Sequence, residues 1–397
     1  MADNNHKRWK WPLIILTALF AVCLAAVGAL EYLIKESQEP ATPKYDPGIW
    51  IELRPDGIIS ANGEPVYTQM RIGAENSVLV FFYGGGICYD DFTGTHPFTG
   101  AKFVADENGF YTADIDGMIP DYCELGLGSS SKNNPFKDWT VIIIPYTTGD
   151  FHLGTTDHLY SGPDGSECTV HHHGYINYRA IMDEAVRYIP DPPDELLVAG
   201  YSAGGFGAAA LTGDLIENYF PQAGHVSVCI DSSLLFYDHF TDVAADIWEV
   251  PDEIAVRFVS DDPIYDLLSS LYDSYGDAIT FMYIGSVRDG ELARYQNYLY
   301  FGHYSVNNML GKVFSRDLSK TIRKLKQKIP EMKFYLFDRL PFSIRPDQIF
   351  LTQHTITVSP MLYWPLTDGM IPVRWIHGCV ADAAVRDHGL NLLGYWQ

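Results

Sequence analysis

Apolar residues form short, mostly β-branched runs that alternate with longer stretches of helical periodicity, beginning near residue 49. The short runs predict strands at residues 77–83, 139–145, 195–200, 225–231, 278–285 and 333–337. The longer stretches predict helices at residues 174–188, 204–219 and 290–300. Strands that alternate with helices are typical of a parallel sheet with helical crossovers. The pattern therefore predicts an α/β fold with a mostly parallel sheet and flanking helices.

The N-terminal segment has a different pattern, because residues 11–30 form a run of 20 residues without a charged side chain. A helix of that length rises about 30 Å, the thickness of the hydrocarbon core of a bilayer. Lys7, Arg8 and Lys10 precede the run, and the positive-inside rule then places residues 1–10 in the cytoplasm. We expect a membrane signal-anchor helix at residues 11–34, with secretion after signal cleavage as the alternative.

Residues 35–48 mix proline, charged and small residues without periodicity, which indicates a stalk between the anchor and the domain at residues 49–397. This arrangement predicts a single-pass protein whose domain is extracytoplasmic. Within the domain, residues 84–138, 250–275 and 301–330 are too long for simple connections. We expect some of these segments to cover the mouth of the functional site.

The charge balance narrows the possible partners. The chain has 27 Lys and Arg against 50 Asp and Glu, a formal net charge of −23. Four cations and two acids fall in the first 35 residues, so the remainder carries −25. Such a surface repels phosphate backbones, and we therefore expect no nucleic-acid partner.

Cysteine usage fits an exported protein only loosely. Beyond Cys23 in the apolar run, the chain has Cys88, Cys123, Cys168, Cys229 and Cys379, an odd number that permits at most two internal disulfides. Cys229 lies in the apolar run HVSVCID, which predicts a buried thiol.

The strongest chemical signal is GYSAG at residues 200–204, which follows the predicted strand ELLVA and precedes a predicted helix. A strand, Gly-x-Ser-x-Gly and a helix are the context of a nucleophile elbow, in which the flanking glycines allow a sharp turn. The turn projects the Ser202 hydroxyl, and the N-terminus of the helix favours developing negative charge. We interpret Ser202 as a nucleophile; a merely structural glycine turn is the alternative.

Upstream, VLVFFYGGGICYDD is a strand followed by three glycines. This is the position of the glycine-rich oxyanion loop in an α/β-hydrolase, where the amide after the nucleophile completes the hole. A phosphate-binding loop is the rival interpretation, but the Lys-Ser/Thr pair of a P-loop is missing. We therefore predict that the amides of Gly86, Ile87 and Ala203 form an oxyanion hole.

The order in this fold is serine, acid, histidine. Asp289 follows the predicted strand AITFMYIG, and His354 follows the last predicted strand, KFYLF, after a loop. We predict Asp289 as the acid and His354 as the general base. Asp231, at the end of the strand HVSVCID, remains the competitor for the acid.

Residues His171, His172 and His173 are a further cluster, but three consecutive side chains rarely face one ion. No Cys or acid at ligand spacing completes a site there. We expect neither a metal nor another cofactor.

Seven motifs occur in order: GGGICYD, IIIPYTTGDFHLG, HHHGYINYRAIMDE, LLVAGYSAGGFGAAA, CIDSS, VRDGELARYQ and QHTIT. Together they resemble the pectin acetylesterase and Notum family of serine esterases over roughly residues 49–360. The resemblance implies an α/β-hydrolase fold and a metal-free triad of Ser202, Asp289 and His354. Three positions depart from the family pattern: Ile87 replaces the usual Trp, Thr147 replaces a Cys, and Tyr201 replaces the Cys that precedes the serine in plant members.

The resemblance implies removal of an acyl group, acetyl foremost, from an O-acylated glycan or another ester. An inactive hydrolase-fold protein that binds at a surface, or a serine peptidase of the same fold, are the alternatives. Because pectin is a polyanion and the domain is acidic, we expect a neutral substrate unless a basic patch, such as Arg288, Arg294 and Arg374, lines the cleft.

Overall fold

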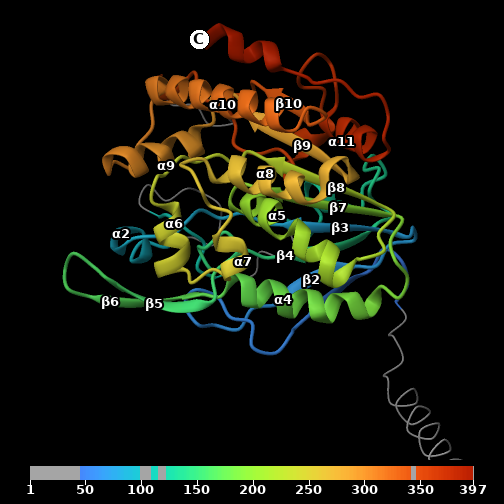
Figure 1. The fold of residues 1–397 in the computed structure, drawn as a ribbon, viewed down its shortest axis with the longest axis horizontal. Helices are drawn as coiled ribbons and strands as arrows, with labels where there is room; N and C mark the ends of the chain where they lie inside the picture. The colour runs from blue at the N-terminus through green and yellow to red at the C-terminus, as the bar shows by residue number, and fades with distance from the viewer. Residues whose placement is uncertain (1–44, 99–108, 115–121, 341–345, 397) are drawn as a thin grey trace, which may run out of the picture. The chain divides into compact units, whose positions relative to one another are not determined.

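An eight-stranded mixed sheet organises the protein, with helices packed along it (Figure 1). We describe it from a computed structural model at residues 45–98, 109–114, 122–340 and 346–396, which belong to one compact unit, Tyr45–Gln397. The predicted signal-anchor helix at residues 11–34 lies outside the described residues. Among the described helices, none is both long and apolar enough to cross a membrane.

The sheet is mostly parallel, as predicted. Its strand order is β1 (Trp50–Leu53), β2 (Thr68–Arg71), β4 (Thr140–Ile144), β3 (Ser77–Phe82), β7 (Glu195–Tyr201), β8 (His225–Asp231), β9 (Ile279–Ser286) and β10 (Lys333–Phe337). Strands β1 and β2 are antiparallel to their neighbours, and the rest pair in parallel. The six predicted strands are confirmed, with ends shifted by at most one residue.

The central strands are continuous apolar runs because helices or loops cover both faces of the sheet. Every residue of β3 and β4 is buried. The register pairs Phe82 with Gly200 and Tyr201 with Asp231. The segments that follow β3, β7 and β8 therefore leave the sheet side by side at its carboxyl edge.

The three predicted helices are α4 (Gly174–Ala185), α5 (Ala203–Asp214) and α9 (Gly290–Phe301). Short turns at Val186–Tyr188 and Leu215–Tyr219 extend α4 and α5 to the predicted ends. The remaining helices are α2 (Asp91–Gly94), α6 (Phe240–Asp242), α7 (Asp252–Ala255), α8 (Pro263–Tyr275), α10 (Asn308–Lys328) and α11 (Pro372–Val380). Helix α5 packs on β3, β7 and β8, which places its N-terminus at the carboxyl edge of the sheet.

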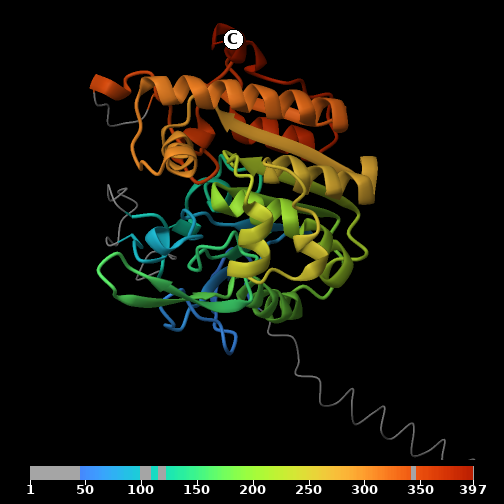
Figure 2. The ribbon, with the colours of Figure 1, turned by 60° about the vertical axis from the view of Figure 1, so that its left-hand side comes forward.

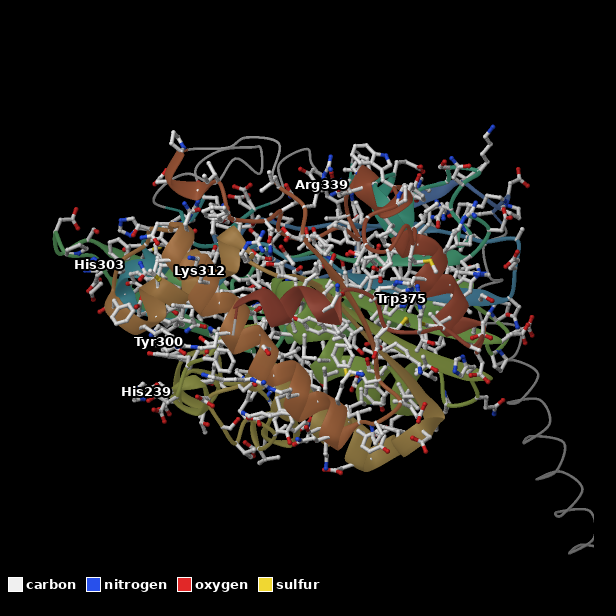
Figure 3. All side chains as sticks on the ribbon, turned by 90° about the horizontal axis from the view of Figure 1, so that it is seen from above. His239, Tyr300, His303, Lys312, Arg339 and Trp375 are labelled. Carbon is white, nitrogen blue, oxygen red and sulfur yellow. The ribbon has the colours of Figure 1, made fainter. Side chains whose placement is uncertain are left out.

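Residues 250–275 and 301–330, which are too long for simple connections, contain three helices that the sequence analysis did not predict: α7, α8 and α10. Helix α10 buries Phe314, Leu318, Ile322 and Leu325, an apolar stripe of helical spacing. Lysines and arginines occupy its other faces, so the apolar periodicity of this helix is hard to recognise in the sequence. Helix α10 contacts α8 and α9, and it runs across the molecule in the view from above, where Lys312 marks its first turn (Figure 3).

A separate antiparallel hairpin consists of β5 (Thr156–Ser161) and β6 (Glu167–His172). It projects from the body next to α2 in both side views (Figures 1 and 2). Strand β6 leads directly into α4, so the base of the hairpin is fixed to the domain while its far end extends outward.

Candidate active site

Ser202 lies between the end of β7 and the start of α5, in a conformation that non-glycine residues rarely adopt. Its φ is 52° and its ψ is −127°. Neighbouring groups hold this backbone: the Ser202 amide donates to the Asp231 carbonyl at 2.9 Å, and its carbonyl accepts from Ser233 Oγ at 2.6 Å. Strain of this kind persists only where the surroundings enforce it and is common at functional sites. The predicted strand–turn–helix elbow is present.

Two glycines of the elbow are required by close packing. A Cβ on Gly200 would stand 2.2 Å from the Gly204 carbonyl oxygen, and one on Gly204 would stand 2.2 Å from the Phe82 carbonyl oxygen. Backbone atoms cannot move aside as a flexible side chain can. The glycines of GYSAG therefore let α5 cross closely over β3 and β7.

The glycine loop after β3 lies against this elbow. A Cβ on Gly84 would stand 2.8 Å from Ser202 Cβ and 3.0 Å from the Ala203 nitrogen. Ala203 is the first residue of α5, where backbone N–H groups have no partner within the helix. The structure thus brings together the two segments predicted to form the oxyanion hole.

The individual amides of the loop differ in their availability. Within the described residues, the Gly86 amide has no hydrogen-bond acceptor, whereas the Ile87 amide donates to the Phe110 carbonyl at 2.9 Å. This bond occupies Ile87, because residues 85–87 pair with residues 110–112 around the Gly86–Tyr111 bridge. In the structure, the Ile87 amide is therefore not free to act as the oxyanion donor that the sequence predicts.

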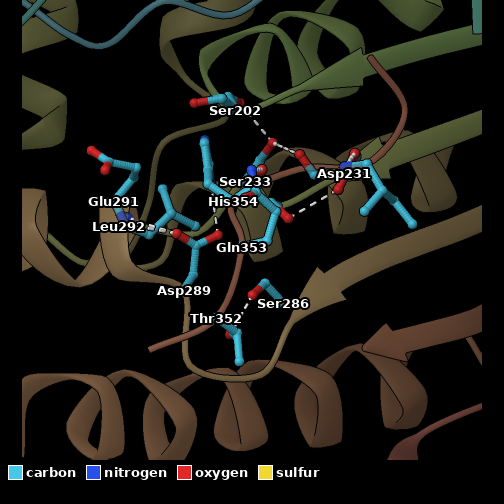
Figure 4. Close-up of polar contacts among 12 residues, drawn as sticks. Ser202, Asp231, Ser233, Ser286, Asp289, Glu291, Leu292, Thr352, Gln353 and His354 are labelled. Carbon is cyan, nitrogen blue, oxygen red and sulfur yellow. Dashed lines mark hydrogen bonds and ion pairs between the residues drawn. The ribbon is translucent and has the colours of Figure 1, made fainter. Parts of the chain in front are cut away.

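Asp289 and His354 are in contact: His354 Nδ1 lies 2.7 Å from Asp289 Oδ2. The other Asp289 oxygen accepts the amides of Glu291 and Leu292, both at 3.0 Å, because Asp289 caps the N-terminus of α9. A bridge between Asp289 and Thr352 brings the loop after β10 to this helix start. In Figure 4 the His354 side chain lies between Asp289 and Ser202.

The environment of His354 sets its charge preference. Burial alone would lower its pKa, but the adjacent Asp289 carboxylate outweighs burial and raises the pKa of His354 above the ordinary 6.5. The Asp289 side chain is fully buried, and that of His354 is 18% exposed. The pair is therefore shielded from water but open on the side of the imidazole.

Asp231, the competing acid, has other partners. Its Oδ2 accepts the amides of Ile356 and Thr357 at 2.7 and 2.8 Å and the Thr357 hydroxyl at 2.8 Å. Burial raises the pKa of Asp231 although these hydrogen bonds oppose the shift. The carboxylate thus fastens the loop that follows His354 to the end of β8, and Asp289 alone of the two is bonded to the imidazole.

Three hydroxyl groups that the sequence analysis did not single out also hold the site. Ser233 Oγ supports the Ser202 carbonyl, Tyr146 Oη donates to the Gly86 carbonyl at 2.8 Å, and Tyr295 Oη donates to the Phe110 carbonyl at 2.6 Å. Each belongs to one of the seven motifs. Sequence spacing, however, does not indicate which hydroxyl meets which carbonyl.

The three arginines considered for a basic patch do not form one. Arg288 is buried and its Nη2 lies 2.5 Å from Asp338, while Arg294 lies 3.4 Å from Glu291. Arg374 lines a separate cavity with Arg386 and His388. We therefore find no cationic cluster among these residues that would balance the acidic surface at the site.

The cysteines and histidines outside the site show two further features. The five described cysteines, from Cys88 to Cys379, are free thiols, and Cys229 is buried as predicted. In the histidine run, His171 and His173 both contact Asp157, whereas His172 is buried and contacts the Thr148 carbonyl.

The family comparison covers the first half of this site. Residues 66–246 match a family model described as PAE: Pectinacetylesterase. The match supports the family resemblance seen in the motifs and includes the glycine loop, the elbow and Asp231. Asp289 and His354 lie C-terminal to it. A search of curated proteins finds no match to the chain.

Proposed function

On the basis of the match to the pectinacetylesterase family, we propose that this chain is a serine carboxylester hydrolase that removes an acetyl group from an O-acylated substrate. The family points to an acetylesterase, and hence to an ester substrate. The observation that carries the proposed serine mechanism is the 2.7 Å contact of His354 Nδ1 with Asp289, beside a serine held at an elbow.

The order of the elements supports an α/β-hydrolase-like fold. The nucleophile follows β7, the acid follows β9 and the base follows β10, so the chain order is serine, acid, histidine. All three segments leave the carboxyl edge of parallel strands of one sheet, with β8 between β7 and β9. This edge is where open α/β sheets hold their ligands.

The proposed reaction begins with proton transfer from Ser202. Because Asp289 accepts a hydrogen bond from Nδ1–H, the neutral imidazole has its lone pair at Nε2. His354 takes the hydroxyl proton there as Ser202 Oγ bonds to the acyl carbon. When the tetrahedral intermediate collapses, the ester C–O bond breaks and His354 gives the proton to the leaving alcohol.

Water completes the cycle by the same chemistry. His354 takes a proton from water, the hydroxide oxygen bonds to the acyl carbon, and the bond to Ser202 Oγ breaks as the serine regains its proton. The carboxylic acid leaves as the product. The amides of Gly86 and Ala203 stabilise the oxyanion in both steps; loss of one such donor typically raises the barrier by about 3 kcal/mol.

Labelling with a fluorophosphonate probe tests the proposed nucleophile. We expect the wild-type protein to be labelled and to hydrolyse p-nitrophenyl acetate faster than esters with longer acyl chains. Ser202→Ala should lose both properties while melting at the wild-type temperature, because the substitution removes only one oxygen atom. A folded wild-type protein without label or turnover would instead favour an inactive binding protein.

We also propose that the domain is extracytoplasmic and anchored by residues 11–34, on the strength of the uncharged run and the cations before it. The full-length protein should remain in the membrane fraction after an alkaline carbonate wash. Protease should reach the domain only from outside the cell. A soluble mature form that begins after residue 25 would contradict the anchor and favour signal cleavage.

A further inference from the structure

The β5–β6 hairpin carries a side-chain cluster that the proposed ester hydrolysis does not use. His171 Nδ1 lies 2.6 Å and His173 Nε2 lies 2.9 Å from one oxygen of Asp157. One ligand atom from each residue lies within 4.8 Å of the others. Two imidazole nitrogens and a carboxylate oxygen thus converge on one point.

Strand geometry explains this convergence. The backbone turns at the end of β6, where the His173 amide donates to the His171 carbonyl at 3.0 Å. The ring centroids of His171 and His173 therefore lie 5.7 Å apart, while His172 contacts the Thr148 carbonyl instead. Asp157 pairs directly with His171 in the antiparallel register, and directly opposed side chains are about 5 Å apart at Cβ. The acid that is missing at ligand spacing in the sequence is therefore supplied by the partner strand.

The surroundings hold the two histidines in place. The His171 amide donates to the Ala61 carbonyl at 2.9 Å, and the His173 carbonyl accepts the Asn177 amide at 2.8 Å in the first turn of α4. The His171 ring rests against Gly63, where a Cβ would stand 3.0 Å from Nε2. The side chains of His171, His173 and Asp157 are 24%, 19% and 53% exposed, so an ion can reach them from solvent.

We propose that Asp157, His171 and His173 form a binding site for a divalent transition-metal ion of the Zn²⁺ type. Neutral imidazole and carboxylate are donors that such ions prefer. A tetrahedral ion with bonds of about 2.0–2.2 Å holds its ligand atoms roughly 3.4 Å apart, so the hydrogen-bonded groups must separate by less than about 1 Å. The ion replaces the protons that the imidazoles share with Asp157 and leaves at least one position for water.

The ion would cross-link the two strands of the hairpin near its base. On the opposite face of β6, His172 Nε2 lies 2.9 Å from Tyr160 Oη and 3.9 Å from Cys88 Sγ. Cys88 directly follows the glycine loop in the chain. A bound ion would therefore stiffen the strand that supports this loop. Its effect on the stability of the fold can be measured separately from ester hydrolysis.

Zinc binding to the purified full-length protein, without a polyhistidine tag, tests the site. After treatment with a chelator, the protein is dialysed against ZnCl₂ with excess Mg²⁺, which occupies scattered carboxylates, and zinc per chain is measured. We expect one zinc ion per chain and a higher melting temperature with zinc, because an ion bound to the folded state stabilises it by mass action. Co²⁺ should give the visible absorption of a tetrahedral site.

Variants of each ligand and a matched control decide between this site and a simple hydrogen-bonded cluster. His173→Ala and Asp157→Asn should weaken zinc binding by more than about tenfold, because each changes a proposed ligand and even the loss of a group that only hydrogen-bonds to a ligand typically costs about tenfold in affinity. His158→Ala changes a histidine of the same hairpin on the opposite face and should bind as the wild type does. Absence of stoichiometric zinc in the wild type, or unchanged binding by the folded Asp157→Asn variant, would overturn the proposal.

Discussion

At the scale of single residues, two buried carboxylates surround the proposed base, and their contacts differ. Asp289 contacts the imidazole, whereas Asp231 binds the loop that follows it. Asp289→Asn should lower kcat by about 10⁴-fold, the loss typical of a triad aspartate, because an amide favours the wrong imidazole tautomer. Asp231→Asn should mainly destabilise the fold, by about 1–3 kcal/mol, because its amide meets backbone donors.

Turnover of p-nitrophenyl acetate and melting temperature, measured on both variants, check this assignment. Ser232→Ala is a useful control, since it removes the hydroxyl that donates to Asp231 Oδ1 at 2.9 Å without changing a charge. If Asp231→Asn reduced turnover more than Asp289→Asn while both variants melted normally, Asp231 would be the catalytic acid.

The pH dependence of the proposed reaction should follow from the charge state of His354. The base works only when neutral, and the Asp289 carboxylate overcomes the opposing effect of burial to raise its pKa above 6.5. Activity should therefore fall as the pH drops through this raised pKa, so the acidic limb of the kcat/KM profile should have its midpoint above 6.5. Asp289→Asn should move the midpoint to lower pH. A wild-type midpoint at or below the ordinary value would argue against the pair.

The same shift has a consequence for stability, with a defined sign. A histidine whose pKa is higher in the folded state stabilises the fold most when it is protonated in both states. This contribution is complete below the unfolded pKa of about 6.5 and is lost as the pH rises through the folded pKa. The protein would thus be less active but better stabilised by this pair in mild acid.

At the scale of elements, two glycine-to-alanine substitutions in α5 should change the stability of the protein in opposite directions. Only one of the two glycines lies where α5 crosses closely over the sheet. Gly204→Ala places a Cβ 2.2 Å from the Phe82 carbonyl oxygen, and the resulting overlap should cost at least about 1–3 kcal/mol and displace Ser202. Gly213→Ala lies in the same helix, and the nearest atom to its Cβ is at 3.6 Å. It should stabilise the protein by about 0.5–1 kcal/mol, because alanine is the better helix former.

Chemical denaturation and esterase assays on both variants measure these effects. Gly213→Ala should retain full activity, since the residue lies near the C-terminal end of α5, away from the elbow. Equal stability of the two variants would show that α5 can move away from β3 without penalty.

At the scale of the whole molecule, the net charge of −23 should disfavour the approach of negatively charged substrates. A negative potential lowers the local concentration of polyanions, and salt screens it over about 8 Å at physiological ionic strength. Because Arg288 and Arg294 are each paired with acids, they do not offset this potential. We expect higher kcat/KM for acetylated xylan-type or simple acetyl esters than for acetylated pectin.

The rate on acetylated pectin should also rise as salt is added, while the rate on a neutral ester stays constant. Initial rates on both substrates over a series of ionic strengths measure this difference. A preference for pectin at low ionic strength that does not change with salt would contradict a neutral natural substrate.

Local sequence determined the parts of this protein whose physical cause is local. Buried parallel strands must be apolar throughout, so β3, β4, β7, β8, β9 and β10 were visible as runs. A sharp strand-to-helix turn needs glycines, so the elbow at Ser202 was visible as GYSAG. The order of serine, acid and histidine then selected Asp289 and His354 without knowledge of their distance.

Tertiary structure decided what depends on partners far apart in the chain. His354 contacts Asp289 and not Asp231. The strands β9 and β10 are neighbours in the sheet, and the loops that follow them meet at the bridge between Asp289 and Thr352. The Ile87 amide is occupied by a carbonyl 23 residues away, and the acid beside His171 comes from the opposite strand. Pairing across strands leaves no periodic trace in either strand alone. The six central strands and the elbow could therefore be predicted from the sequence, but their contacts, the helices α8 and α10 and the β5–β6 hairpin could not.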